Sequence, residues 1–128
     1  EPTERLQVLL EAAAFVKQEY GKNIRVNTNG LSDLVNGTDT APMFQGIVDT
    51  ISISLNTPKA ERYLELTRSR FGIRSFEAVL TFAKNVKKYV DTVILTTVDT
   101  TLSTEEEEEC RAICGKLGVT YRIRPWES

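Results

Sequence analysis

The feature that most constrains this chain is the regular alternation of helical and extended segments along its length. Amphipathic helix patterns are predicted at residues 4–20, 58–67, 75–89 and 103–117, and short strand-like segments at residues 24–27, 48–55, 91–98 and 119–124. Strands that alternate with helices are joined by right-handed crossovers and pair in parallel. The sequence therefore predicts an α/β fold: a parallel four-stranded half-barrel, with the strands in sequential order and the helices on one outer face.

Local signals predict where several helices begin and end. Gly21 follows the first helix as a stop signal, and Pro58 is expected at the first helical position of the second. Ser75 and Ser103 each precede acidic residues and are predicted to be N-caps. Residues 31–46 are expected to be irregular, apart from a short helix that starts near Ala41-Pro42.

Composition excludes several classes of function. The 128 residues are enough for a single domain, residues 1–128, but fewer than the roughly 250 of a complete eight-stranded barrel. A net charge of −2 argues against nucleic-acid binding, which usually requires a basic surface. No apolar run approaches the ~20 residues that span a membrane, and there is no signal-peptide pattern, so we expect a cytoplasmic protein without membrane contact.

Polar side chains occur at the carboxyl ends of all four predicted strands, where parallel α/β folds bind ligands. They are Asn27, Thr28 and Asn29, then Ser52, Ser54 and Asn56, then Thr96, Thr97 and Asp99, and finally Arg122 and Arg124. This set of hydrogen-bonding groups and two cations suits a ligand that bears hydroxyls and a carboxylate. No catalytic residue can be assigned: the chain has no histidine for a Ser–His–Asp set, and it has no Gly-x4-Gly-Lys phosphate loop.

Two features invite a metal-binding interpretation that the spacing does not support. Cys110 and Cys114 lie one helical turn apart, but an iron–sulfur cluster usually needs three or four thiolates. The glutamates at 105–109 point to all sides of a helix and cannot converge on one ion, although they suit the positive end of its dipole. We therefore predict no metal site, and structural roles for both cysteines.

The ordered strand ends resemble those of radical S-adenosylmethionine enzymes. Glu1-Pro2-Thr3 looks like the tail of the Gly-Glu-Pro-Thr segment that ends their second strand, and residues 25–30 are similar to their third strand, which often ends in Thr-Asn-Gly. Residues 48–56 resemble their fourth strand. Residues 60–63, 68–71 and 121–124 are most similar to the TatD-associated radical S-adenosylmethionine proteins. The resemblance covers essentially the whole chain.

This resemblance implies part of a (β/α)6 TIM-like barrel. In that family a Cys-x3-Cys-x2-Cys loop holds a [4Fe–4S] cluster, at which S-adenosylmethionine is cleaved to a 5′-deoxyadenosyl radical. The resemblance further implies that Glu1 contacts the methionine amino group and that Ser54 and Asn56 meet the ribose hydroxyls. It implies that Arg122 and Arg124 meet the substrate or the methionine carboxylate. The other candidate cofactor-binding residues are Asn27, Thr28, Asn29, Ser52 and Thr96.

The chain lacks the cysteine loop, so we expect a C-terminal fragment that is inactive alone. Cluster and S-adenosylmethionine are expected only in the full-length parent, whose substrate the sequence does not identify. Two alternatives remain: a non-catalytic flavodoxin-like or half-barrel module that binds a small ligand, and an interaction domain that pairs through an open sheet edge. We also expect self-association, through the strand edge at residues 24–28 or, because Arg25 blunts that edge, through the concave face.

Overall fold

The computed structural model describes residues 2–126 and contains one four-stranded parallel sheet. Its strands are β1 (Arg25–Thr28), β2 (Thr50–Ser54), β3 (Thr92–Val98) and β4 (Thr120–Arg124). They pair in the order β1-β2-β3-β4, so each strand lies beside its neighbours in the sequence. The predicted α/β class and the sequential parallel order are confirmed.

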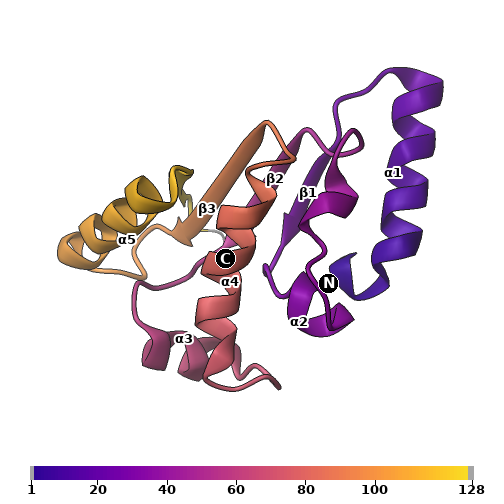
Figure 1. The fold of residues 1–128 in the computed structure, drawn as a ribbon. Coiled ribbons are helices and arrows are strands. Elements are labelled where there is room, and N and C mark those ends of the chain that lie inside the picture. Colours follow the sequence, from indigo (N-terminus) through magenta and orange to yellow (C-terminus); the bar gives the residue numbers. More distant parts are fainter. Residues whose placement is uncertain (1, 127–128) are drawn as a thin grey trace.

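Helices precede, connect and cover these strands. They are η1 (Pro2–Arg5), α1 (Leu6–Tyr20), α2 (Ser32–Asn36), η2 (Ala41–Phe44), α3 (Ala60–Thr67), α4 (Arg74–Val86) and α5 (Thr104–Leu117). In Figure 1, α4 crosses in front of the sheet, with α1 and α2 toward the β1 side and α5 toward the other. Within residues 2–126, no helix combines the length and apolar character needed to cross a membrane.

The core lies between the sheet and α4. Alternate strand residues face the helices, and those of the two central strands are almost fully buried: Ile51, Ile53, Val93 and Leu95. From α4, Val79, Phe82, Ala83 and Val86 complete the same cluster. Cys110 and Cys114 also belong to this core as free, buried thiols, which agrees with their predicted structural role.

Gly30 allows the chain to turn tightly after β1. Its φ is +79°, in the left-handed region that favours glycine. A Cβ at this position would lie 2.7 Å from Ile53 Cγ2 and 3.2 Å from Val79 Cγ1. The missing side chain therefore lets the turn pack directly against both β2 and α4.

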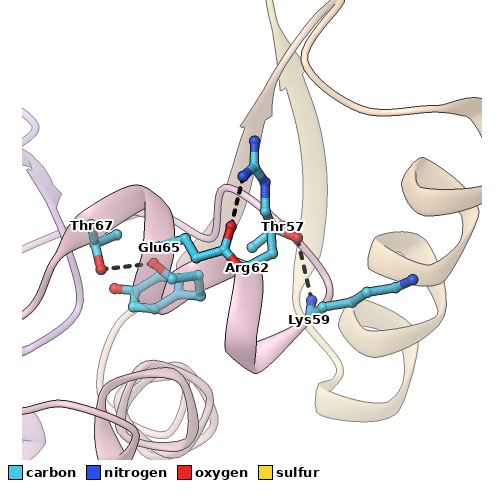
Figure 2. Close-up of polar contacts among 6 residues, drawn as sticks. Thr57, Lys59, Arg62, Glu65 and Thr67 are labelled. Carbon is cyan, nitrogen blue, oxygen red and sulfur yellow. Dashed lines mark hydrogen bonds and ion pairs between the residues drawn. The ribbon is translucent and has the colours of Figure 1, made fainter.

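Three local predictions about helices were wrong. Residues 31–46 are not simply irregular, because they contain α2 as well as the expected short helix at Ala41. Helix α3 begins at Ala60 rather than Pro58, because the Thr57 hydroxyl accepts the Lys59 N–H at 3.4 Å and forms a turn before the helix (Figure 2).

Ser75 is not an N-cap: α4 already begins at Arg74, and the buried Ser75 hydroxyl instead donates to Ser69 Oγ at 2.6 Å. By contrast, the predicted cap at Ser103 is confirmed. Its hydroxyl accepts the Glu106 N–H while the Glu106 carboxylate accepts the Ser103 N–H, both at 3.1 Å. This reciprocal pair forms a capping box at the start of α5.

Candidate functional site

One face of the sheet carries polar residues at nearly every position. Because side chains alternate along a strand, the residues between those that face α4 must point to the opposite side. They are Arg25 and Asn27 in β1, Thr50, Ser52 and Ser54 in β2, Thr92, Ile94, Thr96 and Val98 in β3, and Thr120, Arg122 and Arg124 in β4. We call this set the open face. Parallel sheets are usually apolar on both sides, so its polarity is unusual.

Near the carboxyl ends of the strands, the register aligns three of the predicted site residues in one row. Ser54 lies beside Thr96, and Thr96 lies beside Arg122. Thr96 is 3% exposed, and its hydroxyl donates to the Ile53 carbonyl at 3.5 Å. Ser54 is half-buried and Arg122 is exposed. The row therefore runs from neutral hydroxyls at the centre of the sheet to a cation at its edge.

The arginines of the open face share a hollow. A volume of about 270 Å³ is lined by Arg25, Arg122, Arg124 and Pro125. Residues of both outer strands line it, so the open face is concave. Within the part of the chain that the structure describes, no carboxylate lines this hollow and none of its arginines belongs to an ion pair. The hollow is therefore a cationic environment.

Arg25 was missed as a candidate site residue, although its position gave a usable signal. It lies two residues before Asn27 in the same strand, and a spacing of two places both side chains on one face. The Arg25 guanidinium donates from Nε to Asn27 Oδ1 at 3.2 Å. The two residues therefore act together on the open face, and Ser52 lies beside Asn27 in the neighbouring strand.

Thr28 and Asn29, also predicted site residues, lie away from the open face. Thr28 is buried on the helix side, and its Oγ1 accepts the Gly30 N–H at 3.1 Å. Asn29 Oδ1 accepts the Leu31 N–H, also at 3.1 Å. Both side chains thus shape the turn that follows β1. Glu1, the predicted contact of the methionine amino group, lies outside the described residues.

Asn56 follows β2 in a left-handed conformation, with a φ of 72°. Its N–H and that of Leu55 both donate to the Thr96 carbonyl, at 3.2 and 2.8 Å. This shared acceptor ends the regular pairing of β2 and explains why the strand stops at Ser54. The Asn56 side chain lines two hollows at the carboxyl edge of the sheet.

The cysteines do not fit the cluster that the family resemblance implies. Both lie on α5 in the helix-side core, and burial raises the pKa of Cys110 to about 11 and that of Cys114 to about 12. Because thiolates bind iron, thiols held protonated are poor ligands. Within residues 2–126, no three His, Cys, Asp or Glu residues are grouped so as to hold a metal ion.

A larger hollow, of about 500 Å³, lies at the opposite, amino edge of the strands. It contains the ion pair between Lys17 and Asp49, at 2.6 Å, together with Lys87, Lys88 and Asp91. Asp49 also accepts the Ile24 N–H at 2.7 Å. Its carboxylate ties α1 to the starts of two strands, which is a structural role. Parallel α/β folds bind ligands at the other edge.

No protein-family model matches this sequence, and comparisons with curated proteins and with solved structures find no match either. The fold and the site alone therefore define the class. It is an α/β protein whose parallel four-stranded sheet is covered on one side by helices and presents a concave, polar, cationic surface on the other.

Proposed function

We propose that this chain is the C-terminal part of a radical S-adenosylmethionine enzyme and that its open face binds S-adenosylmethionine. The observation that carries the proposal is the row of Ser54, Thr96 and Arg122 across the concave face. Sequential parallel strands with polar residues at their carboxyl ends agree with the partial barrel that the sequence resemblance implies. Such a barrel binds its ligand on the inner face.

The residues of the row suit the groups of this cofactor. Ser54 and Thr96 offer hydroxyls, and Asn56 an amide, for hydrogen bonds to ribose hydroxyls. Arg122 and Arg124 offer cations for a carboxylate of the methionine moiety or of the substrate. When bound at a reduced cluster, S-adenosylmethionine supplies a 5′-deoxyadenosyl radical that abstracts a hydrogen atom. The described residues do not supply cluster ligands, which a Cys-x3-Cys-x2-Cys loop elsewhere in the parent would provide.

Calorimetry on the full-length parent tests the ribose role. Ser54→Ala and Asn56→Ala should each weaken S-adenosylmethionine binding by about 0.5–1.5 kcal/mol, the loss of one ordinary hydrogen bond. Thr120→Ala is the matched control, because Thr120 lies on the same face but at the amino end of β4. Unchanged affinity in both variants would remove Ser54 and Asn56 from the site.

Iron–sulfur reconstitution tests whether the cluster ligands lie outside this chain, in another part of the parent. When this chain is treated anaerobically with iron and sulfide, we expect no stoichiometric [4Fe–4S] absorbance, because its only two thiols are buried and protonated. The parent should form the cluster and produce 5′-deoxyadenosine. A stable cluster that disappears in the Cys110→Ala variant of this chain would contradict the proposal.

A non-catalytic module that binds a small anion is the second candidate. The favouring observation is the hollow lined by Arg25, Arg122 and Arg124, to which residues 2–126 contribute no carboxylate. Such a hollow attracts an anion with no need for further chemistry. The gene sequence upstream of residue 1 discriminates between the candidates: a Cys-x3-Cys-x2-Cys segment some tens of residues earlier supports the enzyme, and a start codon near Glu1 supports the module.

A further inference from the structure

A separate hollow lies on the helix side of the carboxyl edge, between the ends of β1 and β2 and the loop that joins α3 to α4. Its volume is about 310 Å³. Its walls come from four parts of the chain and include Glu4, Leu31, Tyr63, Arg68, Arg70 and Phe71. Asn56, to which the proposed cofactor site assigns a ribose contact, also lines this hollow, but none of these six residues belongs to the open face or to that site.

Tyr63 places an unused polar group at this hollow. Only 1% of its surface is exposed, and its ring packs edge-on against Phe76 with the ring centroids 5.7 Å apart. Its hydroxyl makes no hydrogen bond with any residue in the range 2–126, yet it is not sealed in the core as an unsatisfied atom. Burial raises its pKa to about 12, so the hydroxyl remains a donor at neutral pH. The hydroxyl of a residue that lines the hollow, with no partner among the described residues, is available to donate to a ligand there.

The loop holds two cations at the same hollow. Arg68 ends α3 in a left-handed conformation with a φ of 48°, and the Arg70 guanidinium stacks on the Phe71 ring, 4.8 Å from its centroid. Neither arginine forms an ion pair within the described part of the chain. Among residues 2–126, Glu4 is the one carboxylate in the lining, so the lining residues from this range carry a net charge of +1.

The loop is also fixed in place before any ligand arrives. Ser69 accepts the Phe71 N–H at 3.2 Å and the Ser75 hydroxyl at 2.6 Å, while its carbonyl accepts the Gly72 N–H at 3.0 Å. These bonds hold the segment between the two arginines against the start of α4. A preformed loop lowers the entropy lost on binding.

We propose that this hollow binds a small organic anion, whose carboxylate or phosphate group is held by Arg68 and Arg70 and by the Tyr63 hydroxyl. The apolar body of the ligand lies against Leu31 and Phe71. Arginine offers paired donors to either kind of oxyanion, and the lining combines them with apolar side chains in one enclosure. The inference does not depend on the proposed cofactor site.

Amide chemical-shift titration of the isotopically labelled chain tests this site with three probes. Benzoate carries a carboxylate on a phenyl ring, and phenyl phosphate carries a phosphate on a phenyl ring. Benzamide has the same ring and no charge. We expect saturable shifts centred on residues 67–72 with benzoate or phenyl phosphate, and none with benzamide. The tighter of the two anions identifies the preferred head group.

Variants then assign the contacts. Arg68→Gln and Arg70→Gln should each weaken binding of the preferred anion about 5- to 10-fold, and Tyr63→Phe, which keeps the ring packing, about 3- to 10-fold. Arg74→Gln is the matched control, since Arg74 is an exposed arginine nearby that does not line the hollow. Binding of benzamide as tight as that of benzoate, no saturable shifts, or an equal loss in Arg74→Gln would overturn the proposal.

Discussion

Asp49 shows how much of this fold one side chain can organise. Its two carboxylate oxygens bind Lys17 Nζ at 2.6 Å and the Ile24 N–H at 2.7 Å, so a residue just before β2 ties it to α1 and to the start of β1. The Lys17 hydrogen bond, followed by that from the Ile24 backbone, lowers the pKa of Asp49 below its usual 3.8. Folding therefore favours the ionised carboxylate.

The first prediction concerns the pH dependence of this contact. A carboxylate with a lowered folded pKa stabilises the protein above about pH 3.8 and loses that contribution as the pH falls through the folded pKa. Asp49→Asn should therefore be less stable than the wild type in urea at pH 7, and the difference should shrink below pH 3.8. Asp91→Asn, an exposed neighbour without a hydrogen bond within the described residues, is the control. A difference that is constant with pH would contradict the ionic role.

A second prediction at this scale concerns Gly30. Gly30→Ala combines backbone strain at φ +79° with a clash against Ile53, and should destabilise the fold by about 2–4 kcal/mol. Gly37→Ala separates the two effects, because Gly37 has a φ of +67° but open space around its Cβ position, and should cost only about 1–2 kcal/mol. Urea unfolding measures the free energy of unfolding of both variants. Equal decreases would mean that the Cβ at position 30 does not clash with Ile53.

At the scale of elements, the helix that the sequence predicted best has the most explicit signal at its start. Ser103 and Glu106 form both hydrogen bonds of the capping box, and three glutamates lie in the first turn of α5. No comparable signal marks α2, which has five residues, too few to show a helical period. At α3, the side-chain turn at Thr57 overrides the preference of Pro58 for the first helical position.

We expect Ser103→Ala to destabilise the chain by about 0.5–2 kcal/mol, because the Glu106 N–H loses its acceptor. Thr104→Ala is the control, since it alters the adjacent position and leaves the box intact. Urea unfolding followed by circular dichroism gives both values. An equal effect in the two variants would show that the capping box contributes little to the stability of α5.

The sequence predicts the part of the candidate site that depends on the alternation of side chains along a strand. A spacing of two within a strand groups Ser52 with Ser54 and Arg122 with Arg124 on one face. The register between strands then places Asn27 beside Ser52, and Thr96 between Ser54 and Arg122. Thr28 directly follows Asn27 in β1, so its side chain lies on the opposite face of the sheet. Asn29 lies beyond the end of β1, in the turn that follows. The hollow at Arg68 and Tyr63 depends on loop geometry, which no periodic pattern encodes.

The whole molecule exposes more surface than a compact monomer of its mass. Its accessible surface is 7540 Å², against roughly 6800 Å² expected for a compact monomer of 14.4 kDa. On α1, the large side chains of Phe15 and Tyr20 are 59% and 65% exposed. The sheet also has an open edge at β1, which pairs only with β2 within residues 2–126.

We therefore expect the chain to self-associate at tens of micromolar, as measured by sedimentation. Two routes are distinguishable by hydrogen exchange. Because the Ile24 carbonyl bonds to β2, the alternate residues Arg25 and Asn27 direct their amides away from it. Edge pairing would protect these two amides at higher concentration, whereas association through the open face would not. A monomer at all concentrations would contradict the prediction.

The polar open face also has a thermal consequence. The open face is polar at most positions, whereas most parallel folds bury apolar side chains on both sides of the sheet, so unfolding exposes less new apolar area than usual. The heat capacity of unfolding rises with that area and should fall below the typical ~12–15 cal/mol/K per residue. The curve of stability against temperature is then broad and shallow, so that cooling the protein changes its stability less than in a fully covered sheet.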